Sequence, residues 1–260
     1  METLITSGQK RTIKNLLRDG AEKYVEALSI GKDLAQNVIM RGGELRETVR
    51  AAIEKAIAEL SGDPIAGWTQ FYRDWLGLTV DLSGVVIPVN PGGLDWINIV
   101  AKELLEASNG RPHGFVIEAM RRKGISVRTY NGDLDAVLSP GISIVKNDLR
   151  KNDRWPDKAS YAVRNRDRAE ADEEYKNLSA DDLAMRNILG STFLERLLHG
   201  YRYFIKTGKH LDISNWTLCS GSRDSGGGVP GVSWDSGKVS VIWRHPSSAF
   251  DVLRSRFVAV

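Results

Sequence analysis

The chain has 260 residues, 42% of them hydrophobic and 27% charged, which is the composition of an ordinary globular protein. Its length allows one large domain or two smaller ones, each with a sizeable core. The formal net charge is only +3, so the composition predicts no general affinity for polyanions. Cys219 is the single cysteine, which excludes a disulfide within the chain and is consistent with a reducing compartment.

The first ten residues lack the charged and then apolar pattern of a secretory signal. No apolar run approaches the roughly 18 residues needed to cross a bilayer. We therefore expect no membrane span, and a cytoplasmic location unless another route exports the protein.

Residues 9–60 have helical periodicity, because their apolar side chains recur at spacings of three and four. These side chains are Ile13, Leu16, Leu17, Tyr24, Val25, Leu28, Leu45, Val49, Ala52, Ile53, Ala56, Ile57 and Leu60. We expect Gly42-Gly43 to interrupt the helical run and Ser61-Gly62-Asp63-Pro64 to end it.

A small α/β unit is predicted next. It begins with an aromatic helix whose members are Trp68, Phe71, Tyr72 and Trp75. A strand over 85–89, helices over 94–107 and 115–122, and a strand over 125–130 follow from the local patterns. Residues 1–145 therefore form one predicted region, helical first and α/β afterwards.

Residues 146–168 change character, because basic side chains alternate with acidic ones around Trp155 and Tyr161. A basic segment with aromatic residues can bind a nucleic-acid backbone. The interleaved acids, and the absence of a known nucleic-acid-binding module around them, favour a solvated entry to the next domain. A protein that associates with nucleic acid through 146–168 is therefore the alternative interpretation.

The remaining residues predict a strand over 160–167, then two helices capped by Ser179 and by Ser191-Thr192, the second ending at Gly208. Two segments with period two follow, Val232 to Asp235 and Val239 to Arg244, separated by residues typical of a turn. They predict an antiparallel hairpin with Val and Trp facing inward and the intervening residues facing outward.

Residues that could support catalysis are scattered. The four histidines, His113, His199, His210 and His245, have no metal-ligand spacing, and no base can be assigned to Cys219. We therefore predict that the protein is not an enzyme and uses no cofactor and no metal.

Several segments resemble a group of bacterial proteins that look like the variable proteins of diversity-generating retroelements. The segments are Tyr161-Ala162-Val163, Arg166-Asp167-Arg168, Asn177-Leu178-Ser179, Phe193 to Leu198, Thr207 to Asp212 and Thr217 to Arg223. The resemblance covers roughly residues 145–260. It implies an α+β protein whose residues 146–260 form a C-type-lectin-like domain of the formylglycine-generating-enzyme kind. A reverse transcriptase rewrites the last exposed residues of such proteins by mutagenic copying at adenines.

The resemblance divides the tail into two sets. The fixed scaffold would be Gly221, Ser222, Arg223, Val229, Pro230, Val232, Trp234, Trp243, Pro246, Leu253, Arg254 and Arg256. The diversified, ligand-binding positions would be Asp224, Gly226, Gly228, Gly231, Ser233, Asp235, Ser240, Ile242, Arg244, His245, Ser247, Ser248, Phe250, Asp251 and Val252. An AAC codon altered at its first two bases cannot yield Lys, Glu, Gln, Met or Trp, and none of these types occurs in the second set.

Two family features are missing from the tail. It has no Glu-Pro-Asn tripeptide of the kind that binds calcium in sugar-binding lectins, and it lacks the cysteine pair of copper-type formylglycine-generating enzymes. The resemblance therefore implies non-catalytic binding of a protein or other cell-surface ligand. The resemblance does not lead us to expect nucleic acid as the partner.

Overall fold

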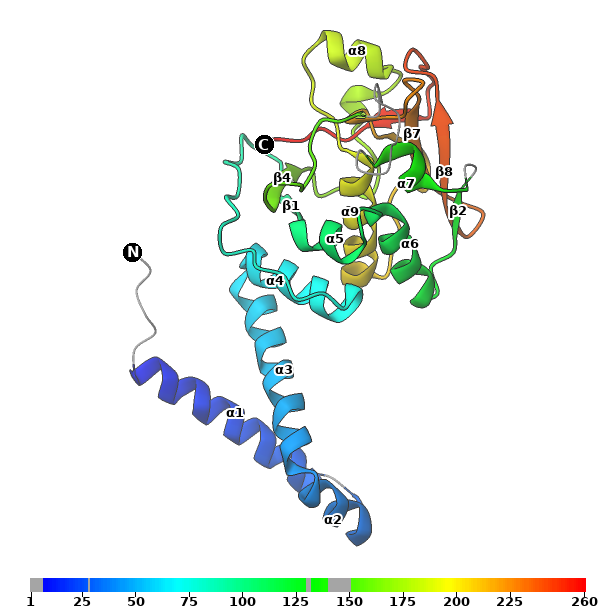
Figure 1. Cartoon of the computed structure of the whole chain (residues 1–260). Helices are drawn as coiled ribbons and strands as arrows, with labels where there is room; N and C mark the ends of the chain where they lie inside the picture. Colours follow the sequence, from blue (N-terminus) through cyan, green and yellow to red (C-terminus); the bar gives the residue numbers. More distant parts are fainter. Residues whose placement is uncertain (1–6, 28, 130–131, 140–150) are drawn as a thin grey trace. The chain divides into compact units, whose positions relative to one another are not determined.

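The computed structural model describes residues 7–27, 29–129, 132–139 and 151–260, and over these residues the chain is an α+β protein (Figure 1). Contacts divide the chain into two compact units, Met1–Ile57 and Ala58–Val260. None of the helices in the described ranges has both the length and the apolar content that a membrane span requires.

The first unit is helical. It contains α1 (Ser7–Ala27), α2 (Lys32–Met40) and most of α3 (Gly42–Ser61). No residue of α1 or α2 is buried. The expected interruption at Gly42-Gly43 is wrong by one position, since the chain turns at Arg41 and both glycines lie in the first turn of α3. Glycine is tolerated there because the first backbone N–H groups of a helix have no partner within the helix.

The second unit combines helices with three small sheets. Its elements are α4 (Pro64–Phe71), the π-helix η1 (Tyr72–Leu76), β1 (Trp96–Val100), α5 (Lys102–Ala107), α6 (Pro112–Arg122), β2 (Val127–Thr129), α7 (Leu134–Leu138), β3 (Lys151–Asn152), β4 (Tyr161–Asn165), the 3₁₀ helix η3 (Glu173–Tyr175), α8 (Ala180–Met185), α9 (Phe193–Thr207), β5 (Trp216–Leu218), β6 (Ser222–Arg223), β7 (Val229–Asp235), β8 (Lys238–Arg244) and β9 (Leu253–Ser255).

The largest sheet has five strands in the order β2-β8-β7-β5-β9. The pairs β2–β8 and β5–β9 are parallel, while β7 is antiparallel to both β8 and β5. Two smaller antiparallel sheets pair β1 with β4 and β3 with β6. The sheet that carries the predicted hairpin therefore also contains a strand from the residues before 145.

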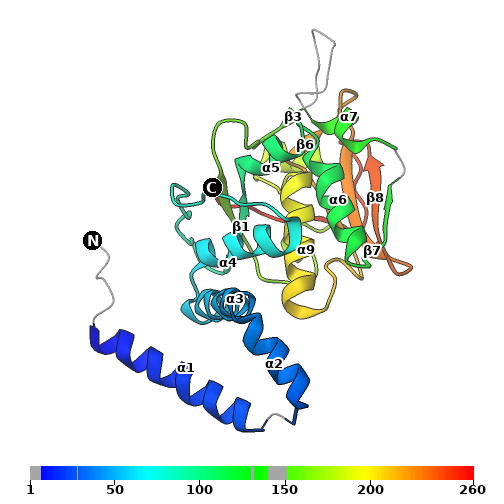
Figure 2. The ribbon, with the colours of Figure 1, turned by 60° about the horizontal axis from the view of Figure 1, so that its bottom comes forward.

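Helix α9 lies at the centre of the core. Its start and end are the predicted ones, because Thr192 caps the first turn and Gly208 ends the last turn with φ of 69°. The helix contacts α6 on one side and β1 on another, as Figure 2 shows. Its buried side chains join those of α4, α6 and the large sheet in one hydrophobic cluster, with Leu197 and Val241 among its members.

This shared core changes the predicted division of the chain. The expected boundary at 145/146 does not separate compact units, because β1 pairs with β4 and β2 pairs with β8 across it. The boundary between the two units falls instead between Ile57 and Ala58 in the sequence. Pairing between strands more than 60 residues apart leaves no local signal in the sequence.

Two local predictions are also wrong. The segment 85–89 is not a strand, and Val86 and Val89 are 83% and 88% exposed. The helix expected over 94–107 is β1 followed by α5. Strand β1 is almost entirely buried, and its apolar residues, interrupted only by Asn98, have no clear period-two alternation to separate it from a helix.

Candidate ligand-binding face

Strands β7 and β8 form the hairpin that the sequence predicts. Their register pairs Ser233 with Ser240 and Gly231 with Ile242. The two turn residues, Ser236 and Gly237, have positive φ angles of 52° and 75°. Such a turn matches the right-handed twist of two antiparallel strands, so it fixes the register of every side chain along the hairpin.

One face of the hairpin packs on the core. Val232 and Val241 are 0% and 1% exposed and belong to the main hydrophobic cluster. Trp234 and Trp243 pack against the same cluster while remaining partly exposed. The opposite face, which we call the outer face, presents Gly231, Ser233, Asp235, Ser240, Ile242 and Arg244. The alternation of the sequence is therefore reproduced in the strand register.

Facing outward does not make every side chain on the outer face accessible. Ser233 and Ser240 are 3% and 0% exposed, and Gly231 is also buried, so the expectation of exposed contacts is wrong at these three positions. The physical reason is that they are small residues among longer neighbours. A Cβ placed on Gly231 would lie 3.4 Å from Ile242 and 3.8 Å from Arg244.

Arg128 on β2 covers the end of the outer face near the turn. Its Nη2 donates to Ser240 Oγ and to Asp235 Oδ2, both at 3.0 Å. The guanidinium thus crosses from an edge strand over β8 to the end of β7. Sequence reasoning placed a strand at this position but missed Arg128, because nothing local shows that β2 runs parallel to β8.

Arg244 forms the centre of an aromatic cluster at the other end of the outer face. Its guanidinium carbon lies 5.8 Å from the ring of Trp216 on β5 and 5.3 Å from the ring of Phe250. Phe250 is 46% exposed. Arginine and aromatic side chains are the types that contribute most to protein interfaces. Trp216 was not among the predicted contacts, since its three-residue strand is too short for a periodic signal.

The segment after β8 supplies the most accessible predicted contacts. His245, Ser247, Asp251 and Val252 are exposed and Ser248 is partly exposed. His245 Nδ1 and Ser247 Oγ lie 2.7 Å apart, and Ser248 N donates to His245 O at 2.8 Å. These contacts hold a turn, and Asp181 N tethers it by donating to Pro246 O at 3.1 Å. Function carried on such a loop can vary without altering the core.

The loop before β7 uses its acidic residue internally. Asp224 Oδ1 accepts from Gly226 N at 2.8 Å and from Gly228 N at 2.7 Å. A Cβ on Gly228 would lie 2.6 Å from Asp224 Oδ2, so a larger residue there must displace the carboxylate. Asp224 and Gly228 are therefore partly exposed residues that hold the loop in shape, whereas Gly226 is exposed.

A buried charge network supports the sheet from within. Asp212 accepts from Arg196 Nη2 at 2.7 Å and from Arg256 Nη2 at 2.6 Å, and all three residues are at most 5% exposed at their side chains. Burial by itself raises the pKa of Asp212, but the ion pairs with Arg256 and Arg196 outweigh it and lower that pKa. Arg256 Nε also donates to Thr217 Oγ1 on β5 at 3.1 Å, which joins the network to the sheet.

Most residues of the predicted fixed scaffold are buried. Gly221, Ser222, Val229, Pro230, Val232, Leu253 and Arg256 are buried, and Arg223, Trp234, Trp243, Pro246 and Arg254 are partly buried. Val229 lies on the outer side of the sheet, in a second small cluster with Ala180, Leu218 and Leu253. The outer face is therefore packed against α8 at the end that carries Val229.

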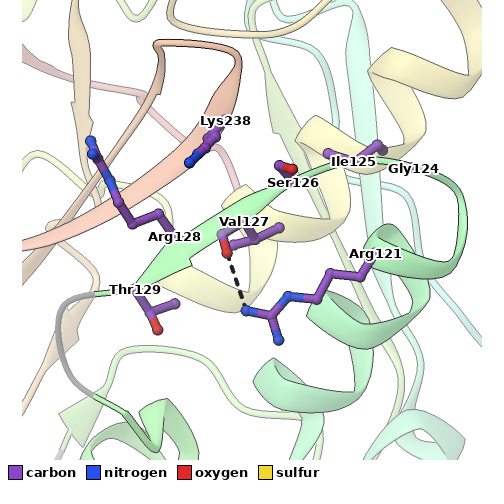
Figure 3. A pocket seen from close by; sticks show the side chains of 8 residues that line it. All are labelled: Arg121, Gly124, Ile125, Ser126, Val127, Arg128, Thr129 and Lys238. Carbon is purple, nitrogen blue, oxygen red and sulfur yellow. Dashed lines mark hydrogen bonds between the residues drawn. The ribbon is translucent and has the colours of Figure 1, made fainter.

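A hollow of about 570 Å³ borders the hairpin at the free edge of β2. Figure 3 shows its lining of Arg121, Gly124, Ile125, Ser126, Val127, Arg128, Thr129 and Lys238. Arg121 Nη2 donates to Val127 O across it at 3.1 Å (Figure 3). None of the predicted contact residues lines this hollow, although Lys238 pairs with Asp235 across the hairpin.

One buried cluster contains the residue types of a catalytic triad. His113 Nδ1 lies 2.8 Å from Asp135 Oδ1, and Ser139 Oγ donates to the same oxygen at 2.9 Å. All three residues are at most 1% exposed, and Ser139 lies on the Nδ1 side of His113, as the aspartate does. Asp135 also accepts from His113 N and Gly114 N at the start of α6. This geometry ties α7 to α6.

Cys219 is also fully buried, and burial raises the pKa of its thiol well above the ordinary value. A thiol in this state is not a nucleophile. Among the described residues, no three His, Cys, Asp or Glu side chains gather as metal ligands would.

Four arginines of the basic segment make contacts within the chain. Arg154 pairs with Glu195 at 2.7 Å, Arg166 with Asp172 at 2.9 Å and Arg168 with Glu174 at 3.0 Å. Arg164 donates to the backbone oxygen of Leu94 at 3.1 Å. Residues 146–150, which open the predicted segment, lie outside the described residues. Three of these four arginines therefore pair with acids of the same chain, and the fourth bonds to the backbone.

Comparisons of the chain with protein-family models, with curated proteins and with solved structures find no match.

Proposed function

We propose that this protein is a non-catalytic binding protein whose ligand is a protein surface, contacted through the outer face and the loop 245–252. The observation that carries the proposal is the cluster of Arg244, Phe250 and Trp216. Phe250 is 46% exposed, and the Arg244 guanidinium lies over the rings of both Trp216 and Phe250. An arginine that contacts aromatic rings has lost much of its rotamer freedom before binding. Binding therefore costs less side-chain entropy at this position.

The packing of the sheet that carries Arg244 and Trp216 favours the same function. The sheet is fixed from within by Val232 and Val241 and by the network of Asp212 with two arginines. Side chains on the outer surface can therefore change without removing core contacts. A rigid base with exchangeable surface residues is what a diversified binding protein requires.

We further propose that residues 146–260 belong to the C-type-lectin-like variable proteins of diversity-generating retroelements. The segments that resemble those proteins include the first part of α9, Asp212 of the buried charge network, strand β6 and parts of β4 and β5. Of these strands, β5 belongs to the sheet that carries the outer face. Under this proposal the diversified positions that matter most are the accessible ones, namely Asp235, Ile242, Arg244, His245, Ser247, Phe250, Asp251 and Val252.

A display experiment tests the binding function. Ile242, Arg244, Phe250, Asp251 and Val252 are randomised in the full chain, and the library is displayed and selected against lysozyme as an arbitrary protein target. We expect folded variants that bind lysozyme and lose binding when Arg244 and Phe250 are returned to their original identities. A matched library at Val232, Val239 and Val241 is expected to yield few folded variants. Equal loss of folding in the two libraries would contradict the proposal.

A further inference from the structure

Helix α1 presents an apolar stripe that the described residues of the first unit leave exposed. Leu16 and Tyr24 are each 69% exposed, Val25 is 64% exposed, and Ile13 and Leu17 are more than 40% exposed. These residues recur at spacings of three and four, so they line one side of the helix. Isolated helices are marginally stable in water and depend on burial of such a stripe. The helix therefore requires a partner.

Charge along α1 identifies the kind of partner. Its first half carries Lys10, Arg11 and Lys14 without an acid, and its second half carries Asp19, Glu22 and Glu26 with two bases, Arg18 and Lys23. Arg18 lies 3.6 Å from Asp19 and 3.7 Å from Glu22 within the same helix, so the second half keeps a net negative charge. A second copy laid antiparallel brings the basic half of each helix beside the acidic half of the other. A parallel copy would place like charges together.

Gly20 lies near the middle of the stripe, where two antiparallel copies would cross. A Cβ at this position would have no atom within 4 Å. Glycine within a helix costs about 0.5–1 kcal/mol relative to alanine. The cost is offset if the absence of a side chain lets two helix backbones approach closely at the crossing.

We infer that α1 mediates antiparallel self-association of this protein, with a second copy of the chain covering the stripe from Ile13 to Val25. The helix has 21 residues and is therefore about 30 Å long, and two antiparallel copies that cross at Gly20 overlap over about two turns on each side of the crossing. An anionic membrane surface is a poorer fit, since it would repel the acidic half. Association would bring two outer faces into one particle and raise avidity for a repetitive ligand.

Sedimentation of the full chain over a wide concentration range tests the association. We expect twice the mass of one chain at high concentration. Leu17→Glu should raise the dissociation constant of the dimer tenfold or more. Asn15→Glu, which adds the same charge on the opposite side of α1, should change it little. A single-chain mass at every concentration, or equal effects of the two variants, would overturn the inference.

Crosslinking tests the orientation. Gln9→Cys and Ala27→Cys place thiols at opposite ends of the same side of α1, and the native Cys219 is buried. An antiparallel dimer predicts a disulfide between the two variants when they are mixed and little within either one alone. Disulfides formed mainly between two Gln9→Cys chains would contradict it. Binding of a single-chain species to anionic vesicles would show that lipid, not a second copy, covers the stripe.

Discussion

Arg128 and Asp235 form an ion pair of 3.0 Å although they lie 107 positions apart in the chain. The pair joins strand β2 to the end of strand β7 and covers Ser240, which is 0% exposed. It shows that the hairpin is completed by a residue from the part of the chain that the sequence assigns to a separate region. It also limits which outward residues can reach a ligand.

Burial of Ser240 predicts that this position tolerates variation poorly. Ser240→Phe should destabilise the protein by about 1–3 kcal/mol, because a larger side chain must displace Arg128 or its neighbours. Ser247→Phe, in the exposed loop, should change stability by about 0.5 kcal/mol or less. Urea unfolding of both variants measures the difference. Equal stability of the two would show that Ser240 is as free to vary as the loop.

The two faces of the hairpin should respond differently to truncation. Trp243→Ala removes a partly buried side chain that packs on the core and should cost about 2–3 kcal/mol. Phe250→Ala removes a side chain that is 46% exposed and should cost less than about 1 kcal/mol. Thermal melting checks both. Comparable losses of stability would refute the inward and outward assignment.

The buried network of Asp212 with Arg196 and Arg256 predicts a large loss of stability when the Asp212 carboxylate is replaced by an amide. Asp212→Asn leaves Arg196 and Arg256 buried without a compensating charge, which should destabilise the protein by about 3 kcal/mol. Asp251→Asn is the matched control, because Asp251 is exposed. Denaturant midpoints compare the two variants. A shift of similar size for both would mean that the network contributes little to the stability of the sheet.

A buried histidine predicts a dependence of stability on pH. Burial, followed by the positive charges of Arg256, Arg196 and Arg202, lowers the pKa of His199 well below its ordinary value. The unfolded chain therefore takes up a proton near pH 6.5 while the folded chain does not, and stability falls as pH decreases below that value.

Replacing this histidine should reduce the dependence. His199→Gln is expected to lose less stability than the original protein between pH 7 and pH 5, measured by urea unfolding at each pH. Parallel pH profiles for the original protein and His199→Gln would contradict the assignment.

Local signals account for the parts of the fold that the sequence predicts correctly. Thr192 and Gly208 mark the ends of α9, and the small residues between Asp235 and Lys238 mark the hairpin turn. In each case the residue that ends the helix or strand is next to it in the sequence, either as a capping side chain or as a residue with positive φ. The alternation along β7 and β8 likewise specifies which side chains face the core.

Long-range contacts account for the rest. Asp212 gives no local sign that it pairs with Arg256, 44 positions later, and β2 gives no sign that it joins β8. The candidate face is predicted in outline, since Arg244 and Phe250 were both identified. Which of its residues are accessible was not predicted, because the burial of Ser233 and Ser240 depends on neighbours from other strands.

The most direct test of the proposed function is to sequence the DNA that flanks this gene. We predict a near-copy of the segment encoding residues 219–260 beside a reading frame for a reverse transcriptase. The copy should differ from the gene only at adenines, concentrated in the codons of accessible residues such as Arg244, Phe250 and Val252. Absence of such a copy, or differences that fall equally on the codons of Val232 and Val241, would contradict the proposal that this face is diversified for binding.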